Sequence, residues 1–319
     1  MTQEPYTVSI LVPVYGVEKY IERCARSIFE QTYHDLDIVF VDDCTPDKSI
    51  EILKRVLDDY PERKEQTKII HNEQNQGIAA VRNTAVVKAS GKFLSFVDSD
   101  DWLEIDAVEE LVKKQIVSDA DVVTGQGVRH NPTSWLYLSR PSFINRKDFI
   151  LDMESESLNH TLWGRLIRKK MFIDNHVKAD ATINVGEDLL LMSKLAYFSK
   201  KNVWTKSLVY HYNCERTLSY TQSTDLIRKA KIQEDNVKAY MALREFFEDK
   251  EYIYFKKATD ELTAVCNGLL FLYLRLDKRD YYQKTLVMMK TMNLRVYNKI
   301  RLCRNNFFLL RFLIKLLGK

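Results

Sequence analysis

The chain has 319 residues and a formal net charge of +4, and 45% of its residues are hydrophobic and 29% are charged. This composition is ordinary for a soluble globular protein with one large domain, or with one domain and an appendage. The five cysteines form no CxxC pair and show no metal-site spacing, a pattern that fits a reducing cytoplasm. We find neither a signal peptide nor a run of about 18 apolar residues, so we expect no membrane-spanning helix.

The first part of the chain alternates between short apolar runs and helical patterns. The apolar runs predict strands over residues 7–13, 36–41, 67–71 and 93–97, and a further strand beginning at 121–124. The helical patterns place apolar residues on one face and cover residues 18–31, 49–60 and 77–89. This alternation predicts an α/β fold with right-handed βαβ crossovers and a mostly parallel sheet.

Carboxylates follow two of these strands. Asp42 and Asp43 follow the second strand, and Asp98, Asp100 and Asp101 follow the fourth. Ligands of open α/β sheets bind outside the carboxyl ends of strands, and clustered carboxylates suit a hard cation such as Mg²⁺ or Mn²⁺. Two structural interpretations compete with this one. Asp101 could N-cap a helix over residues 102–118, and the acids after the second strand could simply form a turn.

The two acidic strand ends also favour a nucleotide ligand. A carboxylate can accept hydrogen bonds from a base N–H or from ribose hydroxyls, so Asp43 and Asp98 could hold a nucleoside while Asp100 holds a metal on its diphosphate. The chain contains neither GxGxxG nor GxxxxGK[ST], so it does not have the sequence of a dinucleotide fold or a P-loop kinase. We therefore expect a metal, rather than a glycine-rich loop, to bind the phosphates.

Four short motifs carry a resemblance to a known family. They are Val12-Pro-Val-Tyr15, Val41-Asp-Asp-Cys-Thr45, Asn75-Gln-Gly77 followed by Arg82-Asn83, and Asp98-Ser-Asp-Asp101. In order and spacing they resemble the motifs of the family-2 glycosyltransferases. The resemblance covers roughly residues 6–220. It implies a GT-A fold, a Rossmann-like sheet flanked by helices, and metal-dependent, inverting transfer of a sugar from a nucleotide sugar, with a UDP-sugar as the expected donor.

The resemblance also implies roles for individual residues. Pro13 and Tyr15 would line the nucleotide pocket, and Asp43 would meet the base. Asp98 would lie near the ribose, and Asp100 would be the metal ligand of the DxD motif. These roles place the nucleotide at the carboxyl ends of the first, second and fourth predicted strands.

Two arginines belong to the same resemblance. Arg82 is expected near the nucleotide, where a guanidinium suits phosphate or a base edge, although it could also be a surface helix arginine. Arg165 stands where many relatives have lysine, and it could reach the diphosphate or the acceptor, or form a structural pair. The chain departs from the family pattern with Gly16 in place of the usual asparagine and Cys44 in place of the usual glycine. These departures affect loop geometry rather than the chemistry.

An inverting transferase also needs a base that takes the proton of the acceptor hydroxyl. The pair Glu187-Asp188, after Gly186, resembles the family's Glu-Asp motif at the start of a helix. The resemblance implies that Asp188 is the base and that Glu187 orients the acceptor or its neighbours. The alternative is a helix N-terminus that is rich in acids for structural reasons.

Further candidates follow the Glu-Asp pair. His211, between two tyrosines at a strand end, could be a further metal or diphosphate ligand, or it could be structural. Arg216 and Ser219 resemble a loop that closes over the diphosphate in relatives.

The last hundred residues have a different character. Helices are predicted over residues 226–248, 252–276 and 281–292, so we divide the chain into a glycosyltransferase domain, 1–220, and a helical region, 221–319. No acid follows Asp280, but nine cations do. Over residues 296–317 these cations alternate with bulky apolar residues, which suits an amphipathic helix on an anionic membrane surface. Packing on the catalytic domain or in a homodimer is the alternative, and this mixture does not favour nucleic acid.

The resemblance implies a glycosyltransferase of surface-polysaccharide synthesis with a glycan or lipid-linked acceptor. It would act in the cytoplasm, peripherally on the inner face of the cell membrane. A nucleotidyltransferase would want a glycine-rich basic loop after the first strand, which residues 14–19 do not provide. A non-catalytic sugar-nucleotide or membrane-binding module would not need both the DxD and the Glu-Asp pairs.

Overall fold

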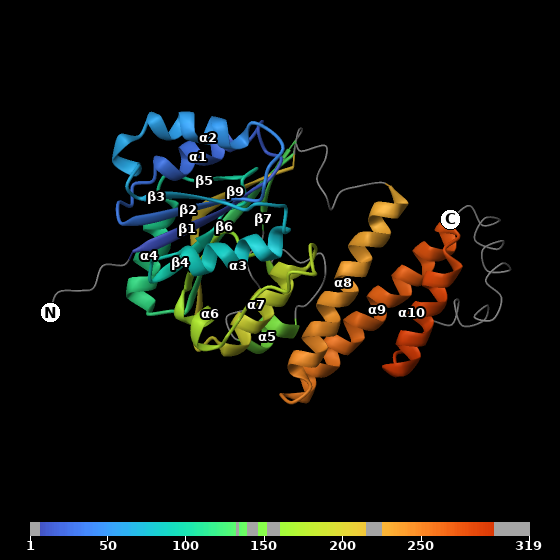
Figure 1. Cartoon of the computed structure of the whole chain (residues 1–319). Coiled ribbons are helices and arrows are strands. Elements are labelled where there is room, and N and C mark those ends of the chain that lie inside the picture. Colours follow the sequence, from blue (N-terminus) through green and yellow to red (C-terminus); the bar gives the residue numbers. More distant parts are fainter. Residues whose placement is uncertain (1–6, 132–133, 139–145, 152–159, 215–224, 297–319) are drawn as a thin grey trace. The chain divides into compact units, whose positions relative to one another are not determined.

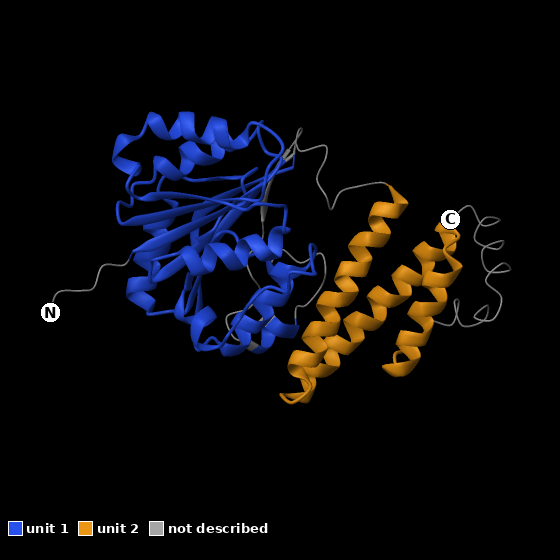
Figure 2. Cartoon of the chain, viewed as in Figure 1, with its two compact units in different colours: residues 1–152, 156–217 blue, residues 153–155, 218–319 orange. Residues whose placement is uncertain are grey.

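The computed structural model describes residues 7–131, 134–138, 146–151, 160–214 and 225–296 (Figure 1). The chain divides into two compact units, one of residues 1–152 and 156–217 and the other of residues 153–155 and 218–319 (Figure 2). The first unit contains a nine-stranded sheet, and the second is helical. Within the described part of the chain, no helix is both long and apolar enough to cross a membrane.

The first part of the sheet is parallel and follows the order β3-β2-β1-β4. Its strands are β1 (Val8–Val14), β2 (Leu36–Asp42), β3 (Thr67–His71) and β4 (Phe93–Phe96). Between them lie α1 (Ile21–Phe29), α2 (Ser49–Asp58), the 3₁₀ helix η1 (Pro61–Arg63) and α3 (Ile78–Lys88). The α/β alternation predicted from the sequence is confirmed, and the predicted boundaries differ from these by at most three residues.

Beyond β4 the sheet is mixed, so the parallel arrangement does not extend across it. The order continues β8-β6-β9-β5, with antiparallel pairs except for β6 and β9, and β7 pairs with β6. The strands are β5 (Trp102–Leu103), β6 (Val122–Asn131), β7 (Ser134–Leu138), β8 (Arg165–Arg168) and β9 (Asn202–Asn213). The helices are α4 (Ala107–Ser118), α5 (Arg146–Leu151), α6 (Lys170–Asp174) and α7 (Glu187–Phe198).

Burial explains why these residues form a central sheet. The side chains of β1 are buried on both faces apart from the half-buried Pro13, as expected for a strand covered by helices on two sides. Helix α1 presents one apolar stripe, including Ile21, Ala25 and Ile28, to the same cluster as Val8 and Ile10. In Figure 1, α1 and α2 lie above the sheet and α6 and α7 lie below it. This packing fixes the carboxyl ends of β1, β2 and β4 at one edge.

The predicted helix over residues 102–118 begins later than expected. Trp102 and Leu103 pair with β9, and α4 starts at Ala107, with Asp106 at the N-cap position. The Asp101 carboxylate instead accepts hydrogen bonds from the Tyr210 hydroxyl (2.7 Å) and from the Asn213 backbone N–H (2.8 Å). The interpretation of Asp101 as a helix N-cap is therefore wrong, because its carboxylate binds residues of β9 and α4 begins only at Ala107.

The C-terminal unit contains three described helices, namely α8 (Leu226–Phe247), α9 (Tyr252–Leu276) and α10 (Arg279–Thr291). Asp225 caps α8, because its carboxylate accepts a hydrogen bond from the Ile227 N–H at 3.0 Å. The three predicted helices are confirmed. The basic segment predicted to be amphipathic lies almost entirely in residues 297–319, which are outside the described residues.

Candidate functional site

The turn that follows β4 is held in place by β9. The Asp98 backbone N–H donates to the Tyr210 hydroxyl (3.1 Å), and the Asn213 side chain donates to the Asp100 carbonyl (3.1 Å). Within the turn, the Asp101 N–H donates to the Asp98 carbonyl at 3.0 Å. Because Asp101 also binds Tyr210 and Asn213, the whole acidic turn is fixed by partners more than a hundred residues away. The sequence gives no local signal for Tyr210 or Asn213.

Arg82 connects this turn to the Glu-Asp pair. Its guanidinium donates to the Asp98 carboxylate (3.1 Å) and to the Glu187 carboxylate. The arginine lies on α3 and is only 6% exposed, so the interpretation as a surface helix arginine is wrong. The structure thus brings together three residues that the sequence motifs singled out, with 105 positions between Arg82 and Glu187.

Three carboxylates share the charge of this one guanidinium. Burial raises the pKa of Glu187 to about 8, although the Arg82 charge acts to lower it. Burial also raises the pKa of Asp98 and of Asp188, again against the effect of Arg82, and Asp100 raises the pKa of Asp98 further. Burial would lower the pKa of Arg82, but the charges of Glu187 and Asp98 raise it. Such perturbed buried groups are typical of functional sites.

The Glu-Asp pair begins α7. Gly186 is the N-cap residue in a left-handed conformation (φ 89°), and Glu187 and Asp188 form the first turn. Carboxylates are favoured there by the helix dipole, and Asp188 accepts a hydrogen bond from the Leu189 N–H at 2.8 Å. Glu187 is buried against Arg82, whereas Asp188 is half-buried. The acid-rich helix start and the proximity to the predicted donor site are therefore both properties of this pair.

Arg165 lies on β8 and is 2% exposed. Its Nε donates to the Thr161 carbonyl (2.8 Å), and its guanidinium donates to the Thr124 hydroxyl (2.6 Å). Burial lowers the pKa of Arg165 to about 10, and the nearby charge of Asp188 opposes this shift. The arginine is thus anchored by structural hydrogen bonds and also acts electrostatically on Asp188.

Asp43 holds the loop that leads into α3. Its buried carboxylate accepts hydrogen bonds from the Asn72 side chain (2.9 Å) and from the backbone N–H groups of Gln76 (2.8 Å) and Gly77 (2.9 Å). Asp42 accepts from the Thr45 N–H at 2.9 Å, as the turn interpretation predicts. The predicted contact of Asp43 with a base is not tested by these bonds.

Pro13 and Tyr15 lie at the carboxyl end of β1, next to the loop after β2. Pro13 is half-buried, and Tyr15 is 48% exposed. The Asp43 N–H donates to the Val14 carbonyl at 3.1 Å, which places these residues at the same edge as Asp43. This edge has an exposed aromatic ring beside a buried carboxylate.

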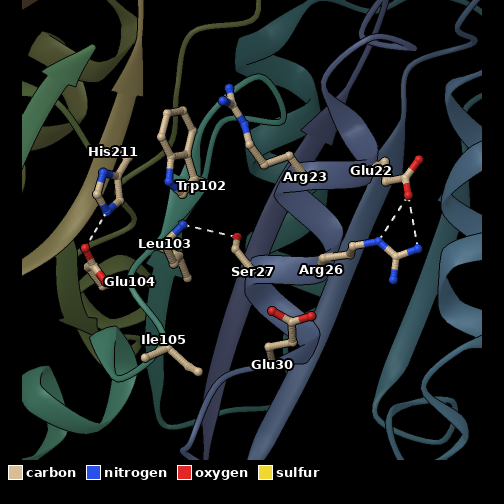
Figure 3. A pocket seen from close by; sticks show the side chains of 10 residues that line it. All are labelled: Glu22, Arg23, Arg26, Ser27, Glu30, Trp102, Leu103, Glu104, Ile105 and His211. Atoms are coloured by element: carbon tan, nitrogen blue, oxygen red, sulfur yellow. Dashed lines mark hydrogen bonds and ion pairs between the residues drawn. The ribbon is translucent and has the colours of Figure 1, made fainter.

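His211 lines a different part of the unit, a pocket of about 580 Å³ between α1 and β5 (Figure 3). Its ring stacks on Trp102 with centroids 4.9 Å apart, and its two nitrogens lie 2.7 Å from His130 Nε2 and 2.7 Å from Glu104 Oε1. The guanidinium of Arg23 covers the Trp102 ring at 3.5 Å. Both ring nitrogens of His211 therefore have protein partners, so we leave this residue out of the proposed metal site. Arg216 and Ser219 lie outside the described residues.

Comparison with known proteins adds three findings. The family model described as Glycosyl transferase family 2 matches residues 9–177. The glycosyltransferase GlyA of Streptococcus pneumoniae is 32% identical over 221 residues, which is 66% of this chain and 31% of that protein, so the chain spans about a third of this relative. The fold is similar to that of S. aureus TarS residues 1–349 in complex with UDP-GlcNAc, with a TM-score of 0.60 at 17% identity over 92% of this chain and 93% of that one.

A mannosyltransferase from Pyrobaculum calidifontis, PcManGT, shares the fold as well. Its structure in complex with GDP-Man and Mn²⁺ aligns with a TM-score of 0.58 at 16% identity, over 100% of this chain and 89% of that one. At this level of identity the likeness concerns the fold alone.

Proposed function

The chain belongs to glycosyl transferase family 2, and on that premise we propose that it transfers a sugar from a nucleoside-diphosphate sugar to an acceptor hydroxyl. The observation that carries this proposal is the bonding of Arg82 to both Asp98 and Glu187, which unites the predicted donor side and the predicted base motif in one buried cluster. A UDP-sugar is the first donor to test, since TarS has been crystallised with UDP-GlcNAc, although PcManGT binds GDP-Man. The acceptor would be a glycan or lipid-linked oligosaccharide of surface-polysaccharide synthesis.

In this proposal Asp188 is the catalytic base. An inverting transfer is a single displacement in which the acceptor hydroxyl attacks the anomeric carbon while the nucleoside diphosphate leaves, and the hydroxyl proton passes to the base. Burial raises the pKa of Asp188, so its ionised form is a stronger base than an exposed aspartate. Glu187, held by Arg82, would orient the acceptor or its neighbours.

Pro13, Tyr15 and Asp43 would form the nucleoside pocket at the ends of β1 and β2. Tyr15 offers an exposed ring beside this edge, and Asp43 offers a buried carboxylate that already organises the loop into α3. Asp98 would accept from the ribose hydroxyls. Arg165 would act on the diphosphate or the acceptor through the charge it places near Asp188.

The acidic turn suits a divalent cation. Asp98 and Asp101 both have a raised pKa, caused first by burial and then by neighbouring charges that include Asp100, so a cation in the turn would stabilise their ionised forms. Across the described segments, no group of three or more His, Cys, Asp or Glu side chains is arranged to hold a metal by itself. Magnesium is commonly held by one or two carboxylates together with substrate phosphates, which fits Asp100 as the protein ligand. When bound, Mn²⁺ or Mg²⁺ would neutralise the charge on the departing diphosphate.

We further propose that the chain works at the inner face of the cell membrane. The support is the run of cations among apolar residues over positions 296–317, which suits an anionic lipid surface. A homodimer is the competing role for this segment. Vesicle binding that depends on anionic lipid would distinguish the two.

The test is a panel of nucleotide sugars, assayed for binding and slow hydrolysis with Mn²⁺ and with EDTA. The wild type should release the nucleoside diphosphate from one donor in a metal-dependent way, and Asp100→Ala should lose this release. Asp106→Ala is the matched control, because Asp106 is exposed and its side chain makes no capping bond. If a folded wild-type chain binds no nucleotide sugar, the transferase proposal fails. NMR of the product linkage tests inversion separately.

A further inference from the structure

We propose that Asn83 is a positioning residue that sets the place of the catalytic helix α7 relative to the donor side. This inference rests on the proposed function, because it concerns the distance between Asp188 and the reacting carbon. Asn83 follows Arg82 on α3, but the two side chains serve different partners. Arg82 binds the acids, whereas Asn83 binds the loop that precedes α7.

The amide of Asn83 makes two hydrogen bonds with one residue. Its Nδ2 donates to the Ala179 carbonyl at 2.8 Å, and its Oδ1 accepts from the Ala179 N–H at 2.9 Å. Ala179 is 6% exposed and lies 96 positions along the chain. Asparagine has the one short side chain that can both donate and accept in this planar arrangement, so the pair of bonds depends on the residue type. The amide therefore fixes both the position and the direction of the loop backbone.

The loop between Ala179 and α7 is closed by its own bonds. The Asp180 carboxylate accepts from the Thr182 N–H (2.9 Å) and hydroxyl (2.8 Å), and the Ile183 N–H donates to the Asp180 carbonyl (3.0 Å). Ile183 is fully buried. A displacement at Ala179 would therefore be passed along a short, internally bonded segment to Gly186, the N-cap of α7.

Residues of α3 and its N-cap contact this segment and the start of α7. Asn83 binds Ala179 and Arg82 binds Glu187, and Gly77 at the start of α3 lies against Asn184. Gly77 has φ +84°, and a Cβ atom there would lie 2.4 Å from the Asn184 side chain. The Gly77 N–H in turn donates to Asp43 at 2.9 Å. The same helix therefore touches the predicted nucleoside residue, the ribose residue and the base motif.

This arrangement assigns a different task to each side chain of the Arg82-Asn83 pair. Arg82 supplies charge to the acids, and Asn83 supplies a neutral, two-point attachment that sets distance. A misplacement of a reacting group by about 1 Å can lower a rate by about 100-fold. Loss of the Asn83 bonds should therefore slow the transfer step while leaving donor binding, whose proposed residues do not include Ala179, largely intact.

The test compares Asn83→Ala, which loses both bonds, with Asn83→Asp, which keeps the bond from the Ala179 N–H. For Asn83→Ala we expect kcat to fall about 10- to 100-fold with the donor KM changed less than about threefold, and Asn83→Asp should lie between this variant and the wild type. Asn267→Ala is the matched control, since this amide also makes two hydrogen bonds to the backbone, to the carbonyls of Thr263 and Arg295, but in the C-terminal unit. It should lower stability without the selective loss of kcat.

Hydrogen exchange gives a readout that needs no activity. In Asn83→Ala, amides of residues 179–188 should exchange faster, while those of β1 and β2 should not. Unchanged exchange in this segment overturns the attachment, and faster exchange with an unchanged kcat overturns the positioning role. A KM increase that matches the kcat loss also overturns it. A folded wild type without turnover on any donor contradicts the proposed function and the positioning role together, whereas the exchange result still decides the attachment.

Discussion

Two clusters of buried polar groups lie at opposite ends of the same parallel strands, and they have opposite electrostatic character. At the amino ends, Asp37 accepts hydrogen bonds from the Ser9 hydroxyl (2.6 Å) and the Ser90 N–H (2.7 Å) and pairs with Lys68 Nζ (2.6 Å). Burial would raise the pKa of Asp37, but these three partners hold it below the usual range. One acid thus has a full set of partners.

At the carboxyl ends the balance is reversed. Asp98, Glu187 and Asp188 all have a raised pKa because burial outweighs the charge of Arg82, the guanidinium that binds two of them. Asp37 has two hydrogen-bond donors and a lysine to itself, whereas Asp98, Glu187 and Asp188 depend on the charge of one arginine. A cluster with excess negative charge is a place where a cation or a proton transfer lowers the energy. The comparison therefore separates a structural acid from candidate catalytic acids.

The largest expected effect distinguishes the two ends by function. Asp188→Asn removes the base, so kcat should fall about 10²- to 10⁴-fold, while the folded state should be unaffected or more stable because the environment of Asp188 disfavours its charged form. Asp37→Asn should leave kcat within about twofold but destabilise the fold by about 1–3 kcal/mol, since Lys68 loses its charged partner. Steady-state kinetics and urea unfolding of both variants measure this contrast.

The two variants serve as controls for each other. If Asp188→Asn retained wild-type turnover, the base would have to be another residue. If Asp37→Asn lost turnover without losing stability, the amino-end cluster would not be structural and the comparison would fail.

The next largest effect is expected for Arg82, the cation that binds both Asp98 and Glu187. Arg82→Gln leaves Asp98 and Glu187 buried without their cation, so kcat/KM should fall about 100-fold and the fold should lose about 3–5 kcal/mol, as when one partner of a buried pair is removed. Arg82→Lys keeps the charge but cannot bind both carboxylates with one fork, so it should recover stability more than activity. Thermal unfolding and kinetics of the two variants separate charge from geometry. Equal recovery of both properties by lysine would contradict the fork geometry.

Most of the fold could be predicted from the sequence, because its signals are local. The periodic patterns place β1 to β4 and α1 to α3, and the same strand ends locate Asp98 and Asp43. The short strand β5 was missed because Trp102 pairs with β9 through contacts that no local pattern encodes. The mixed second half of the sheet was missed for the same reason. Strand direction there is decided by tertiary pairing and not by periodicity.

The site shows the same division. The acids after β2 and β4 could be selected because carboxylates after a strand are visible in the sequence, and Arg82 and the Glu187-Asp188 pair because they resemble family motifs. Their partners could not be selected, since Tyr210 and Asn213 become informative only when their distant contacts are seen. His211 could be selected as a candidate from its residue type, and the structure adds that Glu104 and His130 contact its two ring nitrogens. The chemistry of a residue can thus be inferred from the sequence, whereas its environment is known only from the structure.

A smaller effect is an opposite pH dependence of stability at the two ends. Glu187 has its folded pKa raised to about 8, so the folded state binds this proton more tightly and its contribution to stability, present at low pH, is lost as the pH rises through about 8. Asp37 has its folded pKa lowered, so its contribution is present above the unfolded value and is lost as the pH falls below about 4. Melting temperatures from pH 3 to 9 should show both slopes.

Substitution of each acid tests which part of the dependence of melting temperature on pH that acid causes. Glu187→Gln should flatten the loss of stability between about pH 4 and pH 8, a change of about 2–4 °C for each kcal/mol in a domain of this size. Asp37→Asn should flatten only the loss of stability below about pH 4. A flattening of the slope between about pH 4 and pH 8 by Asp37→Asn would reverse the assignment of the two clusters.

The smallest expected effect concerns a position that favours glycine at each of the two ends, for different reasons. At the amino end, Gly91 is crowded, because a Cβ atom there would lie 2.7 Å from the Ser9 backbone nitrogen and 2.7 Å from the Thr7 carbonyl oxygen. At the site end, Cys44 has φ 58° in the loop after Asp43, in the left-handed region that favours glycine. The glycine at position 91 thus avoids a steric clash, whereas Cys44 retains backbone strain. Because a non-glycine residue in this conformation costs about 1–2 kcal/mol, and glycine loses more chain entropy, Cys44→Gly should gain about 0.5–1 kcal/mol.

Cys44→Ala is the matched control, since it removes the exposed thiol but keeps a Cβ atom in the same conformation. Its stability in urea unfolding should equal that of the wild type, while Cys44→Gly should be more stable. If alanine and glycine stabilised the protein equally, the thiol and not the backbone would be responsible. The loop adjoins Asp43, so the two variants should also be compared for the donor KM. A lower KM in the glycine variant alone would mean that strain at Cys44 disfavours the loop geometry that binds the nucleoside, whereas an unchanged KM would confine the strain to stability.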